Sequence, residues 1–251
     1  MSLLKVEQHE GVVTLTLNDP ERRNLLSAAL CEEIIAAVHA AEKDESAMAI
    51  VIRGAGKAFC AGADLEDLKA ASRGEKQAVE SVYASFMCVA NSTLPTLAVV
   101  EGAAVGAGMN LALACDMRVA TPSAWFDTRF LQIGLHPGGG HGWMLLRAVG
   151  WQTASEWLLL SQRVDAQTAL VKGLIAHCYD AEGLDEGVAQ LLGNLSSTPR
   201  ELLVRTKESL RCGAFQSHES ALKYETEQQM WSLHQPAFED LVTRLQKQLG
   251  R

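Results

Sequence analysis

The sequence predicts an α/β fold followed by a helical C-terminal region, and two observations support this prediction. Short apolar runs at 48–53 and 96–100 each end at glycine, which is typical of buried strands, and helical periodicity alternates with such runs. After about residue 150 the chain contains only segments with helical periodicity. Strand–helix alternation indicates an α/β core, and the length of 251 residues suits one or two domains.

The first half of the chain supplies the predicted strands. Residues 5–8 and 12–17 form two strands around the turn Glu10-Gly11, and Ser27 caps a helix whose apolar positions recur at helical spacing. Further strands are expected at 48–53, 96–100, 117–120 and 124–127, and helices at 77–90 and before 114. The later helices are expected near 152–160, 166–172, 184–194, 199–211, 217–233 and 236–249.

Composition excludes several classes of protein. The formal net charge of −8 and the absence of a basic cluster argue against a nucleic-acid surface. No apolar run reaches the roughly 18 residues of a membrane span, and the first residues, MSLLKVEQHE, do not resemble a signal peptide. The six cysteines show no CxxC pairing, so we expect reduced thiols, a cytoplasmic protein and no zinc or other metal site.

Residues 101–116 read EGAAVGAGMNLALACD, a run of small residues between a predicted strand and a predicted helix. A helix start leaves backbone N–H groups without partners and attracts negative charge. Small side chains let a ligand oxygen reach those groups. Close packing of helices explains such a run equally well.

A second stretch, KAFCAGADLEDL at 57–68, repeats the arrangement of strand, small-residue turn and helix. Two such turns can each direct one N–H at the same oxygen atom. Fixed donors of this kind stabilise the negative charge of an enolate or a tetrahedral intermediate. The pair of turns therefore predicts an oxyanion site.

Four stretches together give the chain a family resemblance: FCAGADL, EGAAVGAGMNLALACDMRVA, QIGLHPGGGHGWMLLRAVG and DAQTALVKGLI. Over residues 3–250 the sequence resembles the crotonase superfamily, also called the enoyl-CoA hydratase/isomerase family. The resemblance implies a ββα spiral core at 1–195 that holds an acyl-CoA site, and a helical trimerisation region at 196–251. It also implies homotrimers or dimers of trimers, an acyl-CoA thioester as substrate, and no cofactor other than the coenzyme A of that substrate.

The resemblance also assigns binding roles by position. The N–H groups of Ala63 and Ala107 would hold the thioester oxygen. The family commonly has glycine at the position of Ala107, and alanine keeps the N–H while its methyl group narrows the site. Coenzyme A would contact Arg22, Lys57, Ala61, Ala63 and Leu65, although Arg22 and Lys57 also fit plain surface charges.

Both glutamates that hydratases of this family use are missing. One position is Asn110, and the other lies in the pair Arg129-Phe130. Hydration needs groups that donate a proton and deprotonate water, and neither an amide nor a phenyl ring does so near neutral pH. We therefore expect little hydratase activity and another enolate reaction, such as isomerisation, decarboxylation, C–C cleavage or thioester hydrolysis.

Three other residues are candidate bases. His136 and His141 flank a proline–glycine loop from which, in relatives with other reactions, catalytic aspartates come. Asp127 precedes this loop and could orient a histidine. The alternative is that Asp127 pairs with Arg129 or Arg118 and that both histidines bond to backbone groups.

Two further readings of the whole chain stay open. A chain that lacks both glutamates but keeps the two small-residue turns also fits a non-catalytic acyl-CoA-binding protein. If the two turns serve only for packing, the chain fits a structural oligomer without a ligand. Trp125, Trp143 and Phe86 could line an acyl pocket or belong to the core.

Overall fold

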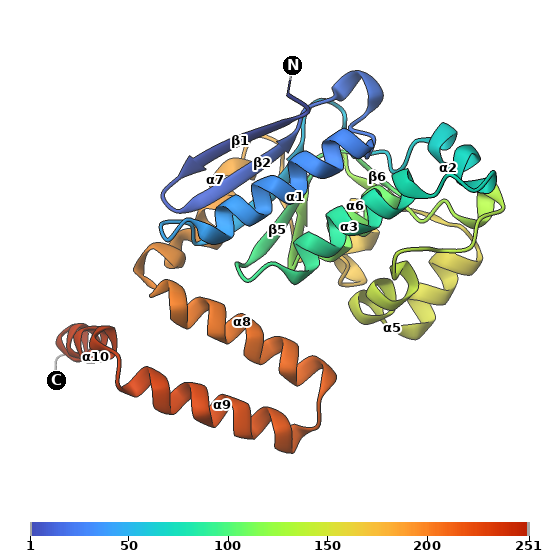
Figure 1. Ribbon diagram of the computed structural model, residues 1–251. Coiled ribbons are helices and arrows are strands. Elements are labelled where there is room, and N and C mark those ends of the chain that lie inside the picture. The colour runs from blue at the N-terminus through green and yellow to red at the C-terminus, as the bar shows by residue number, and fades with distance from the viewer. Residues whose placement is uncertain (1, 250–251) are drawn as a thin grey trace. The chain divides into compact units, whose positions relative to one another are not determined.

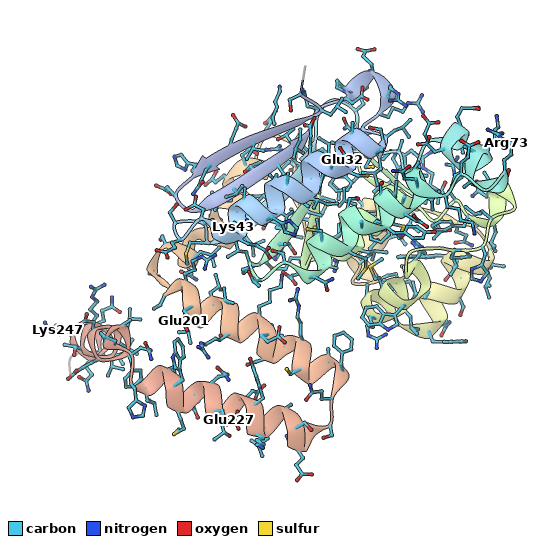
Figure 2. The ribbon with its side chains drawn as sticks, in the orientation of Figure 1. Glu32, Lys43, Arg73, Glu201, Glu227 and Lys247 are labelled. Carbon is cyan, nitrogen blue, oxygen red and sulfur yellow. The ribbon has the colours of Figure 1, made fainter. Side chains whose placement is uncertain are left out.

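The structure is a computed structural model that describes residues 2–249, and the chain forms two compact units (Figure 1). The first unit extends to Gly193 and contains all the strands of the described residues. The second begins at Asn194 and is helical. Charged side chains project from the helices, as Glu32 and Lys43 do from the first long helix (Figure 2).

The larger sheet has six strands in the order β1-β2-β3-β5-β7-β10. Only β1 and β2 pair antiparallel, around the predicted Glu10-Gly11 turn, and the other neighbours are parallel. The bounds are Leu4–His9, Val12–Leu17, Ala49–Gly54, Thr96–Val100, Met117–Ala120 and His177–Cys178. Central strands β3 and β5 are almost wholly buried, which is why they read as continuous apolar runs.

A second sheet has the order β4-β6-β8-β9, with bounds Ala58–Cys60, Ala103–Val105, Trp125–Asp127 and Arg163–Asp165. Successive strand pairs β3–β4, β5–β6 and β7–β8 each contribute one strand to each sheet before a helix follows. This repetition is the ββα spiral, so the predicted fold class is confirmed. Strands β4 and β6 were not predicted because three residues are too few to show a periodic pattern.

Seven α-helices of the first unit surround the two sheets, with α1, α3 and α4 packed in sequence against one another (Figure 1). Their bounds are α1 Ala28–Lys43, α2 Leu65–Ser72, α3 Gln77–Asn91, α4 Ala107–Ala114, α5 His141–Leu159, α6 Ala166–Val171 and α7 Leu184–Leu192. Helix α5 bends at Gly150, and only its second part was predicted because the glycine-rich start hides the periodicity. The second unit contains α8 Arg200–Phe215, α9 His218–Leu233 and α10 Pro236–Gln248.

Buried Asn24 anchors the turn that leads into β4. Its side-chain amide donates to the carbonyl oxygens of Ala55 (2.9 Å), Ala58 (2.8 Å) and Phe59 (3.2 Å). Its side-chain oxygen accepts from the backbone N–H of Asp19 at 3.0 Å. Asn24 has a φ of 56°, a left-handed conformation that asparagine tolerates well. The residue therefore fixes the backbone immediately before the small-residue turn at 61–63.

Arg118 supports the other turn through helix α4. Its guanidinium donates to carbonyl oxygens at the end of this helix and to that of Leu174, the shortest contact being 2.7 Å to Cys115. A buried cation at a helix C-terminus satisfies carbonyls that lack partners and interacts favourably with the helix dipole. Arg118 is thus a cap for α4 and does not pair with Asp127.

We expect Asn24→Ala to lower the free energy of unfolding by about 2 kcal/mol, because three buried carbonyl groups lose their donor. Urea denaturation followed by circular dichroism measures this change. Asn18→Ala is the matched control, since Asn18 donates one exposed bond to the Ser2 carbonyl and its loss should change stability by less than about 0.5 kcal/mol. Equal effects of the two substitutions would contradict the anchoring role of Asn24.

Candidate functional site

A cavity of about 90 Å³ opens between the two small-residue turns of the first unit. One side is formed by the turn after β4 and the other by the turn that starts α4. Helix α3 and the segment 129–138 close it with mainly aliphatic side chains. Five residues that the sequence assigned to a site line this cavity: Ala61, Ala63, Leu65, Ala107 and Asn110.

The two turns are in direct contact, and glycine makes this contact possible. A Cβ on Gly62 would stand 2.6 Å from the Val105 carbonyl oxygen and 3.4 Å from the Ala107 nitrogen. A Cβ on Gly108 would stand 2.1 Å from the carbonyl oxygen of Cys60. Gly62 also has a φ of 98°, which other residues rarely adopt. The glycines thus bring the backbones of residues 62 and 107 side by side.

The backbone amides of Ala63 and Ala107 are unpaired at this cavity. Ala107 is the first residue of α4, so its N–H has no partner within the helix. Within residues 2–249 neither amide donates a hydrogen bond to a backbone or side-chain acceptor. Two free N–H groups on adjoining turns are what an incoming anionic oxygen requires.

Asn110 and His141 form a buried pair beside the amides. The Asn110 Nδ2 atom donates to the carbonyl oxygen of Gly138 at 3.0 Å. Its Oδ1 atom therefore faces His141, whose Nδ1 lies 2.5 Å away and must carry the hydrogen. Both ends of the amide are thus engaged, and the orientation of Asn110 in the cavity wall is fixed.

The His141 ring is neutral because it is buried. Its exposed fraction is 1%, and desolvation lowers its pKa to about 4. The Phe130 ring packs edge-on against it with 4.9 Å between ring centroids. The Nε2 atom has no hydrogen-bond partner among the described residues. His141 therefore keeps a buried lone pair on Nε2, and the Phe130 ring packs against its imidazole.

Asp127 and His136 do not line the cavity, although the sequence analysis identified both as candidate bases. The Asp127 carboxylate pairs with Arg129, whose Nη2 lies 2.6 Å from Oδ2, as the alternative reading expected. His136 is exposed, and its Nδ1 bonds to the neighbouring Pro137 carbonyl oxygen at 2.8 Å. Asp127 is connected to the cavity only through Arg129, and His141 only through Asn110.

The cavity wall also differs from the aromatic lining that the sequence suggested. Trp125 and Trp143 stack on Arg163 and Arg147, and Phe86 is buried in the core. The wall instead contains Phe130 and the aliphatic residues Val79, Val82, Ile133 and Leu135. It also includes Tyr83, which the sequence analysis missed because a single tyrosine on a helix carries no motif.

The neighbouring polar residues divide into buried and surface groups. Burial raises the pKa of Cys60 to about 12, so its thiol stays protonated and is no nucleophile. Arg22 pairs with Asp64 at 2.6 Å on the rim of the turn, and Lys57 is exposed. No group of three His, Cys, Asp or Glu side chains that could hold a metal occurs among residues 2–249.

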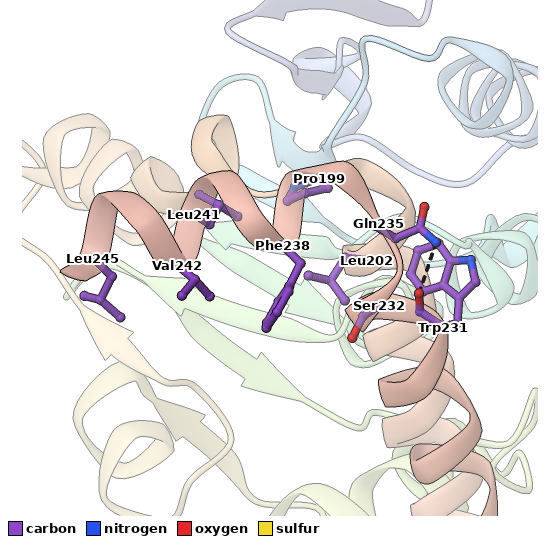
Figure 3. Close-up of a pocket in the computed structure, with 10 residues that line it drawn as sticks. Pro199, Leu202, Trp231, Ser232, Gln235, Phe238, Leu241, Val242 and Leu245 are labelled. Carbon is purple, nitrogen blue, oxygen red and sulfur yellow. Dashed lines mark hydrogen bonds between the residues drawn. The ribbon is translucent and has the colours of Figure 1, made fainter. Parts of the chain in front are cut away.

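A second, more apolar cavity of about 210 Å³ lies within the helical unit (Figure 3). Pro199, Leu202 and Trp231 form one side, and Phe238, Leu241, Val242 and Leu245 of α10 form the other. Several of these side chains stay exposed, with Leu245 at 54%.

None of the helices that the structure describes is both long and apolar enough to cross a membrane.

A ββα spiral with two amide-bearing turns at one cavity defines a class of α/β proteins, and comparisons identify the family. The enoyl-CoA hydratase/isomerase family profile matches residues 7–241. The chain is 42% identical to the "Probable enoyl-CoA hydratase" of Mycobacterium tuberculosis, over 94% of this chain and 93% of that protein. It is 31% identical to 4-chlorobenzoyl coenzyme A dehalogenase-2 of Arthrobacter, over 94% of this chain and 87% of that protein.

Solved structures agree with this result. The enoyl-CoA hydratase of Bacillus anthracis matches with a TM-score of 0.92 at 26% identity, covering 98% of this chain and 96% of that one. A hydratase-like protein of Thermobifida fusca, solved with acetoacetyl-CoA, matches with a TM-score of 0.84 at 25% identity, covering 92% and 95%. The chain therefore belongs to the enoyl-CoA hydratase/isomerase family, as its motifs predicted.

The low pKa of His141 predicts an acid-sensitive fold. In the unfolded chain a histidine titrates near its usual pKa of about 6.5, whereas in the folded protein the pKa is about 4. The unfolded state therefore binds the proton first, and stability falls as the pH drops through this window. We expect wild type to lose about 3 kcal/mol more than His141→Gln between pH 7 and pH 4.

Urea denaturation at several pH values measures this difference, because all other groups titrate alike in the two proteins. The quantity compared is the slope of stability against pH, so a uniform loss of stability in the variant does not affect it. Parallel slopes for wild type and variant would show that His141 is not buried in its neutral form.

Proposed function

We propose that this protein is an enzyme that processes an acyl-CoA thioester by stabilising an enolate at the thioester oxygen. The observation that carries the proposal is the pair of unpartnered amides, on Ala63 and Ala107, at one cavity of a family member. The free N–H at the start of α4 also places the positive end of a helix dipole there. Names of related proteins, among them a coenzyme A dehalogenase and a complex with acetoacetyl-CoA, support this substrate class.

The reaction we propose is an enolate reaction other than hydration. Asn110, held by His141 and Gly138, cannot exchange a proton near neutral pH, and Phe130 brings no polar atom. Of the candidate bases Asp127, His136 and His141, the geometry favours His141, because its ring is neutral and contacts Asn110. To act as a base, His141 would have to expose its buried Nε2 atom.

Coenzyme A would bind along the turn after β4. Ala61, Ala63 and Leu65 line the cavity, and their small or exposed side chains leave the backbone open to the adenine. Arg22 and Lys57 would meet the phosphates, with Arg22 exchanging its Asp64 partner for a phosphate oxygen. Coenzyme A enters as part of the substrate, and no separate cofactor is needed.

The helical region at 196–251 would assemble the protein into a homotrimer or a dimer of trimers in the cytoplasm. Support comes from apolar side chains that a single chain leaves exposed in this unit, among them Leu210, Phe215, Leu222 and Leu245. Exposed apolar surface of this extent marks interaction sites.

Removal of a single amide donor tests the oxyanion proposal. Ala107→Pro deletes the N–H at the first helical position, where proline is well tolerated. Proline also restricts the residue before it, here Gly106. Gly106 has φ 52° and ψ −116°, the mirror image of an extended conformation, so its backbone does not clash with the pyrrolidine ring at position 107. We expect a loss of about 100-fold in exchange of α-hydrogens of acyl-CoA thioesters in D₂O, followed by NMR.

Ala107→Gly keeps the N–H and separates loss of the donor from loss of the methyl group. Binding of CoA thioesters without exchange or turnover on any of them would identify a non-catalytic acyl-CoA-binding protein instead. Absence of any binding in calorimetry would favour a purely structural oligomer. Hydration of crotonyl-CoA at rates typical of enzymes, about 10 turnovers per second, would contradict the interpretation of Asn110 and Phe130.

Light scattering after size-exclusion chromatography tests the assembly. We expect a mass three or six times that of the 27.1 kDa chain. Phe238→Asp places a charge among the exposed apolar side chains of α10 and should shift the mass toward the monomer, because burying an unpaired carboxylate is costly. Glu239→Arg, on the same helix, is the control that changes charge at an exposed position. A monomeric wild type at micromolar concentration would refute the proposed assembly.

A further inference from the structure

Three polar side chains contribute to the wall of the site cavity: Tyr83, Asn110 and Arg129. Both ends of the Asn110 amide are engaged, and the Arg129 guanidinium pairs with Asp127. The Tyr83 hydroxyl makes no hydrogen bond to any part of the chain that the structure describes. It is therefore a polar group of this wall that remains available to a ligand.

The position of this hydroxyl is set by Gly138. A Cβ added to Gly138 would stand 2.2 Å from the Tyr83 oxygen, so the hydroxyl fills the space that a side chain at 138 would take. Gly138 does not have a positive φ, and its backbone would accept other residues. A side chain at position 138 would therefore have to displace the phenol, whereas the backbone conformation there does not need glycine.

The ring of Tyr83 is held in place by its neighbours. It lies on α3, packed at a 5.7 Å centroid distance from the buried Phe86 ring. Its exposed fraction of 39% leaves it at the edge of the cavity and accessible from it. The phenol thus presents its oxygen at the edge of the cavity beside Gly138.

That place lies beyond the amide pair. The Gly138 carbonyl oxygen accepts from Asn110, which stands one helical turn after Ala107. A thioester oxygen between the amides would therefore direct the acyl group along Asn110 toward Gly138 and Tyr83. The rest of this wall is mainly apolar, with Val82, Phe130 and Leu135 among its residues.

We propose that the Tyr83 hydroxyl forms a hydrogen bond to an oxygen atom of the acyl group, so that the substrates are acyl-CoA thioesters with a hydroxyl or keto group on the acyl chain. The inference rests on the proposed function and narrows it. A plain alkyl chain would remove water from the hydroxyl and offer no partner in return. An oxygen atom on the acyl chain replaces the hydrogen bond that the hydroxyl made to water. A site with such a polar group therefore discriminates strongly between oxygenated and plain alkyl chains.

Calorimetry with matched ligands tests the proposal. The probes are butyryl-CoA and its oxygenated counterparts 3-hydroxybutyryl-CoA, 4-hydroxybutyryl-CoA and acetoacetyl-CoA. We expect wild type to bind at least one oxygenated ligand about tenfold more tightly than butyryl-CoA. Tyr83→Phe removes only the oxygen and should abolish the preference. Gly138→Ala should weaken it too, because the new methyl group displaces the hydroxyl.

Tyr179→Phe is the matched control. Tyr179 stacks on His177 and does not line the cavity, so this variant should keep the wild-type preference. If wild type shows no preference, or if Tyr83→Phe keeps it, the role of Tyr83 is refuted while acyl-CoA binding stands. If no CoA thioester binds to wild type, the proposed function and this inference both fail.

Discussion

The structure of the site depends on the close approach of two backbones, at Gly62 and at Ala107. Each turn follows a short strand of the second sheet, and pairing of β4 with β6 brings the turns to the same edge. The Val105 carbonyl oxygen occupies the space where any side chain at position 62 would stand. Asn24 bonds to the backbone just before the first turn, and Arg118 bonds to carbonyls at the far end of helix α4, which the second turn starts. The small residues of both motifs are thus explained by packing and by ligand access together.

The cavity is almost free of net charge. Arg129 neutralises Asp127, and burial keeps His141 neutral. A carboxylate beside the amides would repel the negative charge of an enolate, whereas fixed dipoles attract it. In this protein the stabilisation would therefore come from backbone N–H groups and the start of α4, and proton transfer would fall to a neutral imidazole. A site with two glutamates would instead carry carboxylates close to the developing negative charge.

The sequence predicted the fold and the cavity loops well, for physical reasons. Buried parallel strands such as 96–100 must be continuously apolar, and turns in close contact must be built from glycine and alanine, so both leave patterns in sequence. The partners of single polar residues leave none. Asp127 could have oriented a histidine, and its pairing with Arg129 depends on the left-handed backbone at residue 129. The Asn110–His141 contact joins residues 31 positions apart, and only the loop conformation brings them together.

The same reasoning explains why Tyr83 and Gly138 carried no signal. The glycine-rich loop PGGGHG reads as a flexible turn, and Gly139 and Gly140 do have positive φ values. At Gly138, which does not have a positive φ, the space of the missing side chain is filled by the Tyr83 phenol from helix α3. Substitution of a side chain by a neighbour from another element preserves the volume of the wall while changing its chemistry. If Tyr83 acts as proposed, the cavity combines its backbone donors with a polar contact for the acyl group.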